Sequence, residues 1–179
     1  MARYVLLLRG INVGGKNKLS IATLKEALEE LGYTSVSTYI ASGNVIVDSS
    51  NSARAIEAEI ETVLPKRFKL DSGLIKVLAL SKATFKAMVS GKPKGFGEQP
   101  ATYHSDAIFL MSGTVAVAMT AFDPRDGVDT VWPGKGVIYH QRLSAQRTKT
   151  RLNKMMATPA YKSMTIRNWA TTTKLLELL

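Results

Sequence analysis

The stretch RYVLLLRGINVGGKNK, residues 3–18, decides the fold of the first half of the chain. Its apolar residues run without alternation from Tyr4 to Leu8, which predicts a strand covered on both faces. Glycine and lysine dominate the rest of the stretch, and Ser20 is a good N-cap for a helix that follows. We therefore predict a central strand that leads into a glycine-rich, basic loop at the edge of a sheet.

The first 80 residues continue this strand in the order strand, helix, strand, strand, helix, strand. Further strands are predicted at residues 36–40, 45–47 and 74–80, and the helices follow Ser20 and Asn51 or Ser52. This is the ferredoxin-like pattern, in which the strands lie side by side in the order 4-1-3-2. Its two helices cover one face of the sheet. The other face then needs a cover from the second half of the chain or from a partner.

The second half also mixes helices and strands. A helix is predicted to start after Ser81, residues 92–100 are predicted to form a linker or a mobile loop, and a strand follows at 106–111. Residues 114–122 fit a strand or a helix, with the helix favoured, and residues 128–142 form a hairpin. Helices are predicted at 148–156 and 167–179, the last one capped by Thr165. The predicted fold is α+β: a ferredoxin-like subdomain (1–80) packed against a second, smaller α+β subdomain (81–179) that ends in basic helices.

Composition limits the class of protein. The 179 residues include no cysteine, which rules out a disulfide framework and thiol chemistry. The apolar run at residues 4–8 is too short for a signal peptide, and no run approaches the length of a membrane span. We therefore expect a cytoplasmic protein with no membrane partner. The sequence indicates neither a cofactor nor an oligomeric state.

The formal net charge of +10 favours an anionic partner. No acidic residue lies between Asp129 and Glu177, so the basic residues of that span have no acidic neighbour in the sequence. They indicate either a solvated basic face or a surface for anions or nucleic acid. The candidate basic patch consists of Arg142, Arg147, Lys149, Arg151 and Lys154.

The loop after the first strand is a near miss to a nucleotide-binding P-loop. Gly10, Gly15 and Lys16 match its spacing, but Asn17 stands where Ser or Thr would bind magnesium. The helix also begins too late to place its N-terminus at the phosphates. The glycines could still expose backbone amides to a phosphate or carboxylate, or they could serve the turn alone.

The predicted topology brings this loop to the turn between the second and third strands. We expect a binding site for a small anionic ligand there, which Arg167 and Asn168 could close. Neither turn contains His, Asp or Glu, which argues for binding rather than acid–base catalysis. The site would be formed by Arg9, Asn12, Gly14, Gly15, Ser42 and Asn44.

The remaining polar residues have simpler explanations. His104 and His140 have no neighbour at metal-ligand spacing and are typical of surface or hydrogen-bonded core histidines. Asp123, Asp126 and Asp129 fit turn chemistry better than a calcium loop. No metal site is predicted.

Three stretches carry a resemblance to a known family: residues 7–15 (LLRGINVGG), 38–45 (TYIASGNV) and 165–169 (TIRNW). Together they resemble the signatures of the family catalogued as domain of unknown function 1697, which is mainly bacterial. The resemblance implies an α+β fold and no established catalytic residue or activity. Besides the small anionic ligand, two functions stay open. One is nucleic-acid binding by the basic C-terminal third. The other is protein interaction through an exposed apolar patch around Phe96, Trp132 or Trp169.

Overall fold

The computed structural model describes residues 1–12, 17–40, 43–68, 70 and 75–179. The chain divides into two units of nearly equal length, whereas the sequence predicted a smaller second subdomain. The first unit comprises Met1–Phe85 and Leu175–Leu179, and the second comprises Lys86–Lys174. The boundaries fall within two helices, α3 (Lys82–Ser90) and α6 (Trp169–Leu178).

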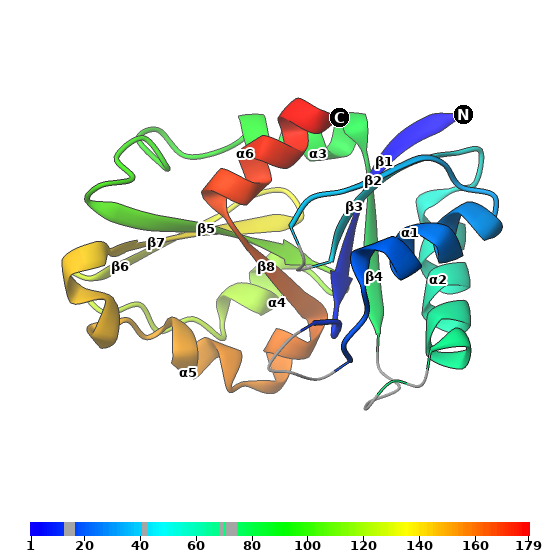
Figure 1. Cartoon of the computed structure of the whole chain (residues 1–179). Helices are drawn as coiled ribbons and strands as arrows, with labels where there is room; N and C mark the ends of the chain where they lie inside the picture. Colours follow the sequence, from blue (N-terminus) through cyan, green and yellow to red (C-terminus); the bar gives the residue numbers. More distant parts are fainter. Residues whose placement is uncertain (13–16, 41–42, 69, 71–74) are drawn as a thin grey trace. The chain divides into compact units, whose positions relative to one another are not determined.

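The first unit contains a four-stranded antiparallel sheet with the order β2-β3-β1-β4 (Figure 1). Its elements follow the predicted sequence order: β1 (Ala2–Arg9), α1 (Ile21–Glu30), β2 (Thr34–Thr38), β3 (Asn44–Ser49), α2 (Ala53–Arg67) and β4 (Lys76–Ser81). The predicted helix caps are present, because the side chains of Ser20 and Ser52 accept hydrogen bonds from the first turns of α1 and α2. The observed strand order is the one predicted from the ferredoxin-like pattern.

The run of apolar residues in β1 is explained by its central place in this sheet. Leu6 lies between Val45 of β3 and Ala79 of β4, and it packs in one core with both helices. Leu24 of α1 and Ile60 of α2 contribute to that core. Val5 and Leu7 point to the opposite face and are equally buried. Both faces of β1 are therefore covered, as the lack of alternation predicted.

The second unit contains another four-stranded antiparallel sheet, with the order β6-β7-β5-β8. Its strands are β5 (Tyr103–Leu110), β6 (Asp129–Pro133), β7 (Val137–Leu143) and β8 (Met164–Asn168). Helix α4 (Val115–Met119) connects β5 to β6, so the prediction of a helix within residues 114–122 is confirmed. Between β7 and β8 lie the 3-10 helix η1 (Ser144–Lys149), α5 (Leu152–Met156) and the 3-10 helix η2 (Pro159–Ser163).

The second sheet repeats the topology of the first. In each unit the first strand pairs with the third and the fourth, and the second strand lies at the edge next to the third. The sequence shows no matching repeat, because the second crossover here is built from short helical pieces instead of one long helix. Ala118 of α4 and Met155 of α5 pack against Ile108 and Ile138 on one face of this sheet.

Candidate functional site

The end of β1 meets the turn between β2 and β3, as the topology predicted. The backbone N–H of Leu8 donates to the carbonyl oxygen of Gly43 at 2.8 Å. A Cβ atom at Gly43 would lie only 2.8 Å from the carbonyl oxygen of Leu8 and 3.3 Å from the side chain of Ile11. Since Gly43 also has a φ of +75°, this close approach requires glycine.

Two of the predicted ligand-binding residues at this edge are engaged in the loops themselves. Asn12 donates from Nδ2 to the carbonyl oxygen of Leu19 at 2.9 Å, and its Oδ1 accepts from the N–H of Leu19 at 2.8 Å. Asn44 is 1% exposed and donates to the carbonyl oxygen of Tyr39 at 3.1 Å. These amides close turns, which corrects their assignment as groups offered to a ligand. Gly14, Gly15 and Ser42 lie outside the described residues, and Arg9 is half-buried.

The third predicted stretch adopts a different local structure. Thr165 is buried within β8 and does not cap a helix. Asn168, the last residue of β8, has that role: its Oδ1 accepts from the N–H of Thr171 at 2.7 Å at the start of α6. Arg167 donates to the hydroxyl of Thr165 and the carbonyl oxygen of Ile166, and burial lowers its pKa to about 10. Arg167 and Asn168 both belong to the second unit. A site that they share with the first sheet stays a prediction.

Acidic residues from earlier in the chain neutralise much of the predicted basic patch. Arg142 donates to Asp106 at 2.7 Å, and Arg151 donates to Asp123 at 2.8 Å. Lys154 lies 3.9 Å from the same Asp123 carboxylate. Arg147 and Lys149 are exposed, and no described residue pairs with either of them. The acid-free span in the sequence is therefore not an acid-free surface.

Segment 92–100, predicted as a linker or mobile loop, is anchored by Phe96. This side chain is 1% exposed, which also corrects its place in the predicted exposed apolar patch. Its ring meets the edges or faces of Trp132, Tyr139 and Trp169, with centroid separations of 5.9, 5.3 and 5.0 Å. Such edge-to-face contacts contribute beyond the buried area alone. The cluster fixes Trp169 at the start of α6.

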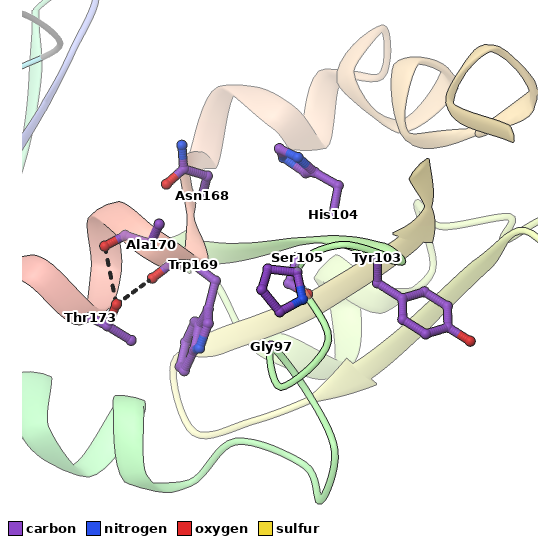
Figure 2. Close-up of a pocket in the computed structure, with 9 residues that line it drawn as sticks. Gly97, Tyr103, His104, Ser105, Asn168, Trp169, Ala170 and Thr173 are labelled. Atoms are coloured by element: carbon purple, nitrogen blue, oxygen red, sulfur yellow. Dashed lines mark hydrogen bonds between the residues drawn. The ribbon is translucent and has the colours of Figure 1, made fainter. Parts of the chain in front are cut away.

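A pocket of about 410 Å³ lies beside this cluster (Figure 2). It is formed where the start of β5 meets the junction of β8 and α6, and the volume is within the range of small-molecule sites. Gly97 is part of its wall because a side chain there would collide with Trp169: a Cβ would lie 2.2 Å from Cδ1 and 2.4 Å from Nε1 of the indole. The lining residues are Gly97, Pro100, Tyr103, His104, Ser105, Asn168, Trp169, Ala170 and Thr173.

The pocket presents hydrogen-bond donors that the described part of the protein does not use. Asn168 caps α6 with its oxygen, and its Nδ2 has no acceptor among the described residues. The indole N–H of Trp169 likewise has no acceptor there. The hydroxyl groups are occupied, since Ser105 donates to Oε1 of Gln141 and Thr173 donates to the carbonyl oxygen of Trp169. The unused groups are donors next to the positive end of a ten-residue helix.

Behind the pocket lies a buried network of charged groups. His104 Nε2 lies 3.0 Å from Asp106 Oδ1, and the other oxygen of Asp106 accepts from Arg142 and lies 3.6 Å from Nδ1 of His140. Nε2 of His140 lies 3.3 Å from Asp129. The two carboxylates thus face opposite sides of one imidazole, and within the described residues no group of His, Asp or Glu is arranged to hold a metal.

Both carboxylates of this network have a lowered pKa. Burial raises the pKa of Asp106, but the hydrogen bond with His140 and the charges of His104 and Arg142 outweigh it. Burial also raises the pKa of Asp129, and hydrogen bonds from Thr150 and from the backbone of Arg151 and Arg125 reverse the direction. The network therefore holds two ionised carboxylates in the second unit, where they orient Arg142 and His104.

Pocket and network do not form a nucleophilic triad. Ser105 lies next to His104 in β5, and neighbouring residues of a strand point to opposite faces. The hydroxyl of Ser105 donates to Gln141 at 3.0 Å rather than to an imidazole. The geometry thus favours a binding site over acyl-transfer chemistry.

Fold and site together define a class: an α+β protein of two units with the same strand order and a small-molecule pocket in the second. The chain belongs to the family described as proteins of unknown function, DUF1697, whose signature matches residues 1–139. It is also similar to a solved structure, that of the conserved bacterial protein SP0830 from Streptococcus pneumoniae, with 30% identity and a TM-score of 0.82. That match covers 100% of this chain and 98% of the other.

No curated protein matches the chain. Among the described residues, none of the helices has the length and apolar character needed to cross a membrane.

Sequence reasoning named Asn168 but missed the pocket around it. The pocket joins residues 97–105 with residues 168–173, and only the pairing of β5 with β8 brings these segments together. A useful signal was present in the sequence. An arginine and an asparagine are unfavourable in the first turn of a helix, and the structure explains this because the helix begins after them.

Proposed function

We propose that the protein binds a small organic anion, a carboxylate with a flat apolar body, in the pocket lined by Asn168 and Trp169. The observation that carries the proposal is the pair of unused donors, Asn168 Nδ2 and Trp169 Nε1, in the wall of a pocket of about 410 Å³. A carboxylate offers acceptors only and gains from the positive helix terminus. The faces of Tyr103, Pro100 and Trp169 suit an aromatic or other planar body.

The charge of the chain supports the same class of ligand. With a formal net charge of +10, the protein attracts small anions to its surface. In the pocket itself, Asp106 is engaged by His104 and Arg142, so its negative charge is balanced locally. An anion-binding role for the edge of the first sheet stays a separate prediction, carried by Arg9, Gly14, Gly15 and Ser42.

Substitution of Asn168 tests the proposal. In a Trp132→Phe background, Trp169 is the only tryptophan, and its fluorescence reports on the pocket. We expect benzoate to change this signal saturably and neutral benzamide to bind more weakly. Asn168→Asp keeps the capping oxygen but replaces the donor with a negative charge, so we expect at least about a tenfold loss of benzoate affinity.

The matched control is Asn168→Ser, which also keeps a capping oxygen and adds no charge. It should weaken benzoate binding by less than Asn168→Asp does. Equal benzoate affinity in the parent and in Asn168→Asp would refute the proposed role of this pocket.

A further inference from the structure

A groove of about 400 Å³ lies on the helix-covered face of the second sheet, apart from the residues that line the pocket of Asn168. Its floor includes Asp106 of β5 and Ile166 of β8, and its walls come from η1, α5 and η2. The basic residues Arg142 and Arg147 both line it. We infer that this groove is a second ligand site, which binds the phosphate group of a small phosphate monoester.

Arg142 is held in place for such a ligand. One guanidinium nitrogen, Nη1, donates to Asp106 at 2.7 Å, and Asp106 is itself held by His104. The Arg142 side chain is 19% exposed, and its other N–H groups have no acceptor among the described residues. An arginine fixed on one side by a carboxylate loses little further side-chain entropy when it binds an anion on its other side.

Arg147 supplies the second positive charge. It projects from η1, is exposed, and has no partner among the described residues. The side-chain amide of Asn153 also lines the groove and has no partner there. The lining thus carries two arginines against one carboxylate, Asp106, whose oxygens already accept from Arg142 and His104.

The chemistry of the groove favours a phosphate monoester over a carboxylate or bare ion. A phosphate monoester has three terminal oxygens and close to two negative charges, which two guanidinium groups can share. A planar carboxylate is satisfied by one bidentate arginine. Met156, Tyr161 and Ile166 add an apolar side to the groove, which gives the organic part of the ester a surface to contact.

A matched pair of charge-removing variants tests the inference. Arg147→Ala removes a groove arginine, whereas Lys149→Ala removes the same charge two residues later at an exposed position that does not line the groove. Calorimetric titration with phenyl phosphate should show at least about a tenfold loss of affinity in Arg147→Ala and less than about a twofold loss in Lys149→Ala. Both residues are exposed, so neither variant should unfold the chain.

Three further arms decide the source of binding. Inorganic phosphate should bind more weakly than phenyl phosphate, because it lacks the apolar contact. Asn168→Asp should leave phenyl phosphate binding unchanged, which separates this inference from the proposed function. Equal losses in Arg147→Ala and Lys149→Ala would overturn the inference. It would also be overturned if a single-stranded oligonucleotide bound more tightly than phenyl phosphate with equal sensitivity to both variants, since that behaviour marks a diffuse nucleic-acid surface.

Discussion

Replacement of Gly97 by alanine tests the contact that shapes the pocket. Gly97 has a φ of +72°, so alanine there costs roughly 1–2 kcal/mol in the backbone alone. Its Cβ would also lie 2.2 Å from Cδ1 of Trp169. The indole is wedged against Phe96 and cannot move freely, so relief of this overlap should cost about 1–3 kcal/mol more.

Gly95→Ala provides the matched control. Gly95 has a similar φ of +82°, but no atom lies within 4 Å of the position that a Cβ would take there. The backbone term is therefore common to both variants, and the difference between them isolates the collision with Trp169. Urea unfolding followed by circular dichroism should give a free energy of unfolding that is lower for Gly97→Ala than for Gly95→Ala by about 1–3 kcal/mol. If the two variants differ by less than about 0.5 kcal/mol, the close packing of Gly97 on Trp169 is refuted.

Three other predictions follow from particular hydrogen bonds and charges. Asn168→Ala removes the cap of α6 and should lower the free energy of unfolding by about 1 kcal/mol, whereas Asn168→Asp should retain most of it; thermal melts distinguish the two. Asn12→Ala removes both bonds to Leu19 and should destabilise the first unit by about 1–3 kcal/mol in urea unfolding, and a neutral result would contradict the structural role of this amide. Asp106 and Asp129 have pKa values below 3.8 in the folded chain, so the unfolded chain takes up protons first as the pH falls. Their contribution to stability should be complete well above pH 3.8 and lost progressively below it; Asp106→Asn should flatten this part of a plot of melting temperature against pH.

The fold of the first unit was predictable because each strand announces its place. The unbroken apolar run of β1 required two covered faces, and Ser20 and Ser52 marked the helix starts with their side-chain caps. β8 was missed for the opposite reason. It runs directly into α6 with no intervening turn, and Asn168 serves both as the last strand residue and as the helix cap.

The candidate sites were harder to predict because their partners are distant in sequence. The acids that neutralise Arg142 and Arg151 are Asp106 and Asp123, which precede the acid-free span. Polar residues in glycine-rich turns also have two uses that sequence does not separate. Asn12 bonds to its own loop, whereas Asn168 caps a helix with one atom and leaves the other unused.

The central claim is that Trp169 and Asn168 donate to an anion in the pocket of the second unit, and the indole N–H signals test it most directly. The chain has two tryptophans, so a proton–nitrogen NMR spectrum contains two indole signals, which Trp132→Phe assigns. On titration with benzoate, we predict that the Trp169 signal shifts saturably while the Trp132 signal moves little, and that Asn168→Asp abolishes the shift. A Trp169 signal that does not respond to benzoate, or that responds equally in Asn168→Asp, would contradict the account.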